Sequence, residues 1–131
     1  MLVFMQRMGI DFGTKKIGIA LTDESGVMAF PHEVIPNDKN LLKYMETLIN
    51  KRKVKELVIG MSLDNEGKPN DVHKLVEEFM MDITLAVGIP VHLEPEQYST
   101  QQAARIQGRN QQTDAAAAAL ILDSFITRNK Q

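Results

Sequence analysis

The stretch from Met8 to Asp23 constrains the fold of this chain most, because it contains two apolar segments separated by a glycine-bearing turn. In the second segment Ile17, Ile19 and Leu21 alternate with small or polar residues, the period of two that is typical of a strand. Asp11 stands near the end of the first segment, and a carboxylate buried there could not stay charged without a partner. Small residues nearby would keep other side chains away from it, namely Gly9, Gly13 and Gly18. The pattern predicts a β-hairpin that leaves Asp11 accessible, although an Asp that only caps the Gly-Thr turn would fit the same residues.

The rest of the chain alternates between predicted strands and helices. Residues 27–35 form a third extended segment, and residues 37–53 form a helix with its apolar residues on one face. Residues 57–59 lack alternation, as expected of a central parallel strand that is covered on both faces. The remaining predicted elements are a helix up to about residue 86, a strand at 89–93, a helix from a Ser-x-x-Gln capping box at Ser99, and a helix from Thr113 to about Arg128.

This order of elements predicts an α/β fold with a mixed five-stranded sheet. The first three strands follow one another in antiparallel succession, and right-handed crossovers place the fourth strand beside the first and the fifth beyond it. The sheet order is then 3-2-1-4-5, with strand 2 antiparallel and helices on both faces. The length of 131 residues favours a single domain over 1–131. Ligands of such sheets bind beyond the carboxyl ends of the parallel strands. Asp11 ends its strand there, and Glu94 and Glu96 are expected just past the fifth strand.

Composition limits the possible functions only in part. The net charge of −2 gives no overall attraction to nucleic acid, so such binding would need a local basic patch or bridging metal ions. The absence of cysteine excludes disulfides and thiolate metal sites, and it fits a reducing compartment. The apolar opening at residues 1–5 is interrupted by Gln6 and Arg7, too soon for a signal peptide or a membrane span. We expect a cytoplasmic protein without membrane association, either a monomer or a homodimer.

Three acids from distant parts of the chain could meet at the carboxyl edge of the sheet. Asp11 ends the first strand, Glu96 follows the fifth, and Asp114 lies in the first turn of the last helix. Like charges held together repel unless a cation neutralises them. Carboxylate oxygens favour Mg²⁺ or Mn²⁺, and two such ions can activate a water and stabilise the leaving oxygen of a phosphodiester. Alternatives stay open, since Glu96 could be an exposed loop acid and Asp114 an acid that stabilises a helix N-terminus.

Five alanines follow Asp114, at residues 115–119. They exceed what helix propensity requires. Small side chains would let the last helix lie close against the sheet and would bring Asp114 toward Asp11. A simple helix-packing motif would have the same composition.

Four segments carry a resemblance to a known family. Residues 9–20, GIDFGTKKIGIA, resemble an opening Gly-hydrophobic-Asp-x-Gly-x-Lys-Arg-Ile-Gly motif, and residues 114–122 resemble a closing Asp-x-x-Ala-Ala-x-x-Ile-Leu motif. Weaker matches are residues 58–63 to a Gly-Leu-Pro-Leu loop and residues 96–103 to an Asp-Glu-Arg-Leu-Thr-Thr-x-Glu-Ala segment. Through these motifs the chain resembles the YqgF-type nucleases, also called RuvX or pre-16S rRNA nucleases, of the RNase H-like superfamily.

The resemblance implies an RNase H-like fold and a role for several residues. Asp11, Glu96 and Asp114 would be the catalytic acids that bind Mg²⁺ or Mn²⁺. Lys15 and Lys16, at the tip of the hairpin, could contact phosphates of a nucleic-acid substrate, although lysines in turns are usually only solvated.

The chain also departs from the family pattern. Pro95, Gln97 and Gln102 stand where the family has an acid, an Arg and a Glu. The family's basic loop before the last Asp is reduced to residues 108–112, in which Arg109 remains as a candidate phosphate contact. Fewer cationic groups should weaken binding to a phosphate backbone. The departures therefore bear on substrate affinity and identity more than on the metal site.

The favoured hypothesis is a metal-dependent endonuclease that hydrolyses phosphodiester bonds of structured nucleic acid. The resemblance makes 5′-end processing of pre-16S rRNA in ribosome biogenesis the leading role, with Holliday junction resolution second. A nucleotide-binding module of the actin-like type is the rival from another class, since Asp-x-Gly-Thr also opens phosphate loops in such folds. Those folds place two domains around the nucleotide, and this chain has room for one. A relative that binds RNA without cleaving it is a third possibility.

Overall fold

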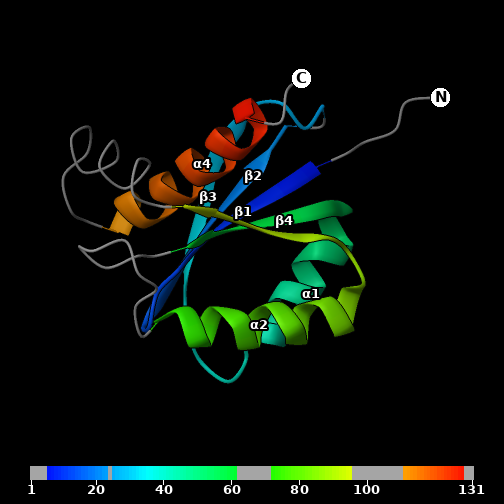
Figure 1. Cartoon of the computed structure of the whole chain (residues 1–131), viewed down its shortest axis with the longest axis vertical. Coiled ribbons are helices and arrows are strands. Elements are labelled where there is room, and N and C mark those ends of the chain that lie inside the picture. Colours follow the sequence, from blue (N-terminus) through cyan, green and yellow to red (C-terminus); the bar gives the residue numbers. More distant parts are fainter. Residues whose placement is uncertain (1–5, 24, 62–71, 96–110, 129–131) are drawn as a thin grey trace.

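The computed structural model describes residues 6–23, 25–61, 72–95 and 111–128. Its centre is a five-stranded sheet in the order β3-β2-β1-β4-β5 (Figure 1). The strands are β1 (Gln6–Phe12), β2 (Lys16–Thr22), β3 (Ala29–Pro36), β4 (Val54–Met61) and β5 (Val91–Pro95). β2 is antiparallel to both β1 and β3, and β4 is parallel to both β1 and β5. The predicted sheet order and strand directions are confirmed.

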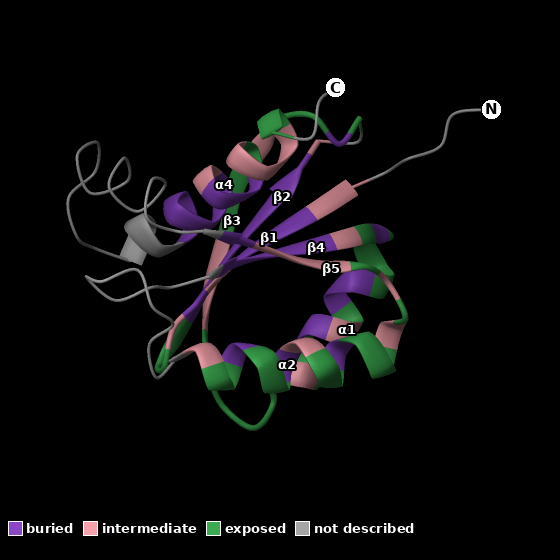
Figure 2. Ribbon diagram, viewed as in Figure 1, coloured by how far each residue is buried: buried purple, intermediate pink, exposed green. Residues whose placement is uncertain are grey.

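Helices cover both faces of this sheet, as predicted. α1 (Leu41–Arg52) and α2 (Val72–Val87) lie on one face, and α4 (Gln111–Arg128) lies on the other (Figure 1). Successive residues of β1 face opposite sides of the sheet. Met8, Ile10 and Phe12 enter the core on the α1–α2 side, and Gly9 faces α4. The inner strands are the most continuously buried part of the described chain (Figure 2). Within the described ranges, no helix is long and apolar enough to cross a membrane.

Two apolar clusters hold the helices to the sheet. The larger one lies under α1 and α2, and the two helices contribute to it Leu41, Met45, Leu48, Ile49, Val76, Phe79 and Ile83. The smaller one lies under α4 and consists of Ala20, Val58, Ala118, Ala119, Ile121 and Leu122. Full burial of a large aliphatic or aromatic side chain is worth about 1.5–3 kcal/mol. The α4 face therefore has less apolar stabilisation than the face that α1 and α2 cover.

α4 lies very close to β1. All five alanines from 115 to 119 are buried. A Cβ atom placed on Gly9 would lie 2.6 Å from the carbonyl oxygen of Ala118 and 2.8 Å from Cβ of Leu122, so a larger residue would have to displace the helix. The prediction that the alanine run brings the last helix close against the sheet is confirmed.

The bounds of some elements differ from those predicted. α1 begins at Leu41 rather than near residue 37, because Asp38 first forms a turn in which its carboxylate accepts a hydrogen bond from the Asn40 amide at 2.9 Å. β5 extends to Pro95, so Glu94 lies inside the strand and not just past it. The helix predicted from Ser99 falls outside the described residues.

Candidate active site at the carboxyl edge of the sheet

Asp11 is the last residue but one of β1, at the carboxyl end of the strand. Its side chain points to the α4 side, because Gly9 faces α4 and side chains alternate along a strand. The residue is half-buried. In the described part of the chain, no hydrogen bond or ion pair reaches its carboxylate. With no partner among the described residues, the Asp11 carboxylate is a candidate ligand for a cation.

Glycines flank Asp11 in the sheet. Gly18 of β2 is its partner across the antiparallel pair. On the other side Ile10 pairs with Ile59, so the next position level with Asp11 on β4 is Gly60. Both glycines are buried. Neither neighbouring strand therefore places a side chain level with the carboxylate, as the glycine pattern around Asp11 predicts.

Asp114 is the fourth residue of α4. Ala118, whose carbonyl faces Gly9, follows one helical turn later, and four residues of an α-helix span about 6 Å. Asp11 lies two residues beyond Gly9 on the same face of β1. The backbones that carry Asp11 and Asp114 thus belong to two elements in direct contact.

The remaining predicted site residues are Glu96, Arg109, Lys15 and Lys16, of which the two lysines are described. Glu96 and Arg109 lie outside the described residues. Lys15 and Lys16 are exposed at the tip of the β1–β2 hairpin and the start of β2, close in sequence to Asp11. Within the described ranges, no group of three or more His, Asp or Glu side chains could hold a metal ion. Convergence of the three acids therefore stays a prediction.

Glu94 is a buried acid whose partners could not be inferred from sequence. It lies level with Gly60 in β5, and its residue exposure is 3%. Its carboxylate accepts hydrogen bonds from Ser124 Oγ and Arg128 Nη1 of α4, each at 2.8 Å. Each oxygen of Glu94 thus accepts a hydrogen bond from a side chain of α4, so this carboxylate, unlike that of Asp11, has protein partners among the described residues. The nearest signal in the sequence is a Ser and an Arg four residues apart on the last helix, which identifies no partner by itself.

A second polar network lies on the same face toward the amino end of the sheet. Glu56 of β4 accepts a hydrogen bond from Arg7 Nε of β1, and its other oxygen lies 2.9 Å from His92 Nε2 of β5. Arg7 Nη1 also donates to the Gly26 carbonyl at 2.6 Å. Burial raises the pKa of Glu56, but the hydrogen bonds and charges of Arg7 and then His92 outweigh it and leave that pKa below its ordinary value. The network fixes β1, β4 and β5 relative to one another.

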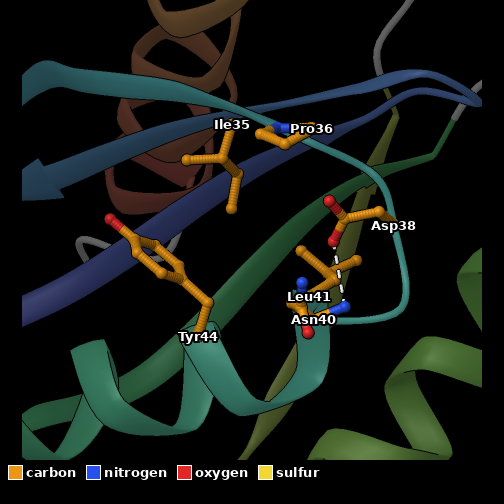
Figure 3. A pocket seen from close by; sticks show the side chains of 6 residues that line it. All are labelled: Ile35, Pro36, Asp38, Asn40, Leu41 and Tyr44. Carbon is orange, nitrogen blue, oxygen red and sulfur yellow. Dashed lines mark hydrogen bonds between the residues drawn. The ribbon is translucent and has the colours of Figure 1, made fainter.

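A shallow hollow of about 240 Å³ lies on the opposite side of the sheet, between β3 and the start of α1 (Figure 3). Its lining is mainly apolar and consists of Ile35, Pro36, Asp38, Asn40, Leu41 and Tyr44. The Tyr44 hydroxyl donates to Glu33, which raises the pKa of Tyr44 to about 12 and keeps the phenol protonated. Since Asp11 faces α4 on the other side of the sheet, this hollow is separate from the candidate site at the carboxyl end of β1.

The family model RuvX, described as Holliday junction resolvase, matches residues 5–128. The chain belongs to the RuvX family. A relative from Maridesulfovibrio salexigens, named "Putative pre-16S rRNA nuclease", is 30% identical over 134 residues, which cover 95% of this chain and 99% of the relative. A relative of the same name from Rickettsia akari is 29% identical, covering 94% of this chain and 86% of the relative. The predicted membership of a nuclease family is confirmed.

Solved structures of similar fold agree with this family assignment. Thermus thermophilus RuvC in complex with a Holliday junction substrate matches with a TM-score of 0.66 at 14% sequence identity, covering 96% of each chain. At this identity the likeness concerns the fold alone. The RNase H-like fold predicted for this RuvX-family chain is confirmed.

Proposed function

We propose that this chain is a divalent-metal-dependent endonuclease that hydrolyses phosphodiester bonds of structured nucleic acid, with 5′-end processing of pre-16S rRNA as its leading role. The observation that carries the proposal is Asp11, a half-buried carboxylate at the carboxyl end of β1 with no partner among the described residues. Membership of the RuvX family and the names of its relatives support nuclease chemistry. The names of those relatives also favour an RNA substrate.

The chemistry of the donors fits a hard divalent cation. Asp11 supplies carboxylate oxygens, which Mg²⁺ and Mn²⁺ favour, and the glycines beside it place no side chain level with the carboxylate. Glu96 and Asp114 are proposed as the other ligands, one following β5 and one in the first turn of α4. A pair of such ions, when bound, activates a water and stabilises the leaving oxygen.

The remaining groups would act on the substrate. Lys15 and Lys16 extend from the hairpin next to Asp11 and are exposed, so their ammonium groups could hold the backbone on either side of the cleaved phosphate. Arg109 is proposed as a further phosphate contact. These cations would orient the phosphodiester toward the acids without reading its sequence.

The proposal is tested by incubating the protein with precursor rRNA, a four-way DNA junction and plain single strands, with and without Mn²⁺. We expect metal-dependent cleavage of the precursor, and a loss of about 100-fold or more of that activity in Asp11→Asn, the order typical of removing a single catalytic group. The variant should keep the Tm of the wild type within a few degrees, because Asp11 has no partner among the described residues. Unchanged cleavage by Asp11→Asn would remove the assignment of this residue.

Holliday junction resolution is the second candidate, because the family description and the RuvC complex both concern that substrate. Cleavage of the four-way junction but not of precursor rRNA would favour it. The actin-like alternative predicts instead that ATP binds tightly without nucleic acid, which calorimetry can measure. A cytoplasmic location and a monomeric or homodimeric state complete the proposal, and light scattering of the purified chain would decide the latter.

A further inference from the structure

Glu94 combines deep burial with full hydrogen bonding. Its side chain is 4% exposed, whereas that of its partner Arg128 is 62% exposed. Desolvation of a carboxylate is costly, and a pair of this kind is favourable only when the geometry is good and the remaining oxygen is also hydrogen-bonded. Ser124 provides that second bond. The contact is therefore directional, unlike the alanine packing along the same helix.

Of the two elements that Glu94 joins, α4 contains the proposed ligand Asp114, and β5 is followed directly in the sequence by the proposed ligand Glu96. Glu96 follows Glu94 by two residues, immediately after β5, and Asp114 belongs to the helix that Ser124 and Arg128 occupy. Resting on the proposed function above, we propose that Glu94 is a positioning residue that sets the direction of α4 and thereby the place of Asp114 in the metal site. Glu94 itself does not contact metal or substrate.

Besides the packing of the Phe125 ring on His92 of β5, with ring centroids 4.8 Å apart, two contacts between α4 and the sheet bear on the direction of the helix. The first is the close approach of Ala118 to Gly9, and the second is the Glu94 contact at Ser124. At 1.5 Å per residue, Ser124 lies about 9 Å from Ala118 along the helix, and Asp114 lies about 6 Å from Ala118 in the other direction. If α4 pivots at Ala118, a displacement of about 1 Å at Ser124 moves Asp114 by about 0.7 Å. Such a shift is large for a metal ligand, since metal–oxygen distances vary by only about 0.2 Å.

Apolar packing holds α4 against the sheet along its length. The residues of α4 that face the sheet between the two points are alanines and branched aliphatic side chains. Apolar contact is non-directional, and alanine has no rotamers that interlock with a neighbour. Loss of the Glu94 contact should therefore tilt α4 without unfolding it.

The experiment measures Mn²⁺ binding by calorimetry and the Mn²⁺ concentration that half-saturates cleavage. Glu94→Gln keeps the shape of the side chain but weakens both contacts, and we expect a weakening of Mn²⁺ binding of about tenfold, similar to the loss of outer-shell partners at other metal sites. Arg128→Gln perturbs the same contact from the exposed side. It leaves the Glu94 carboxylate bonded by Ser124 but without its cation, which costs stability, and it should change Mn²⁺ binding in the same direction. The double variant should lose no more Mn²⁺ affinity than the single variant with the larger loss, because both substitutions remove the same interaction.

Two control variants separate positioning from general destabilisation. Glu33→Gln makes the same chemical change at a carboxylate on the other side of the sheet, where it accepts a bond from Tyr44. Val76→Ala removes buried methyl groups under α2 and lowers the Tm without touching α4. Both should bind Mn²⁺ like the wild type.

Wild-type Mn²⁺ affinity in Glu94→Gln and Arg128→Gln would overturn the positioning role and leave the proposed function standing. An equal loss of affinity in Val76→Ala would overturn it as well, since any destabilisation would then suffice. A wild type that neither binds Mn²⁺ nor cleaves would overturn the proposed function, and the positioning role with it.

Discussion

The close approach of α4 to β1 gives a prediction that depends on a single methyl group. In Gly9→Ala the new Cβ would lie 2.6 Å from the Ala118 carbonyl oxygen and 2.8 Å from Leu122 Cβ. The first of these atoms belongs to the backbone, and the second is present in every residue but glycine. No change of rotamer can relieve the overlap, so α4 or β1 must move.

The expected magnitude follows from two opposing terms. Overpacking of a close-packed core costs about 1–3 kcal/mol. Replacement of glycine by alanine also lowers the entropy of the unfolded chain, which stabilises the fold by about 0.4–1 kcal/mol. At the middle of both ranges the net loss is about 1.3 kcal/mol, and an unfolding entropy of about 2.1 cal/mol/K per residue converts this to a fall in Tm of about 5 °C for a chain of this length.

Thermal unfolding followed by circular dichroism, together with the midpoint of urea unfolding, measures the effect. Gly88→Ala is a useful comparison, because Gly88 has a φ of 67° but no atom within 4 Å of the place that a Cβ would occupy. That variant carries backbone strain without steric overlap and should leave the packing of α4 unchanged. A Gly9→Ala variant as stable as the wild type, or more stable, would refute the close contact between α4 and β1.

Two further predictions concern the metal site and the Glu56 network. Mn²⁺ should raise the Tm of the wild type and not that of Asp114→Asn, and equal shifts in both proteins would count against Asp114 as a ligand. Glu56 has a pKa lowered from its ordinary value of 4.5, so the stability it contributes is fully present above about pH 4.5 and is lost as the pH falls through its folded pKa. Glu56→Gln should therefore show a shallower loss of stability between about pH 5 and the acid limit than the wild type, and identical pH profiles of the free energy of unfolding would contradict this assignment.

The sheet order could be predicted because it depends on local patterns and general rules. Alternation at Ile17, Ile19 and Leu21 identifies β2, and the apolar run at 57–59 identifies the central strand β4. The handedness of crossovers then leaves one arrangement, which the structure confirms. The end of α1 is also predictable, since basic residues at 51–53 mark a helix C-terminus.

Features that depend on distant partners could not be predicted. An acid is a poor candidate for a buried strand position, so the sequence alone places Glu94 just past the fifth strand. Ser124 and Arg128 make its burial possible, and they lie 30 and 34 residues away. α1 begins at Leu41 and not near residue 37, because the Asp38 carboxylate accepts a hydrogen bond from the Asn40 amide in a turn that replaces the first helical residues. For the acids, the sequence locates Asp11 near the carboxyl end of the first strand and Asp114 in the first turn of the last helix. That Glu96 converges with both stays a prediction.

The alanine run of α4 has a consequence for variation within this protein. Where helix and sheet touch through methyl groups and a glycine, their separation is set by backbone atoms and cannot adapt by side-chain rearrangement. A single larger residue at 115–119 would lift the whole helix as a rigid rod. Substitutions in the alanine run could thus change the distance between Asp11 and Asp114 although both acids are retained in the sequence. A comparison of the acidic residues alone would not detect such a change.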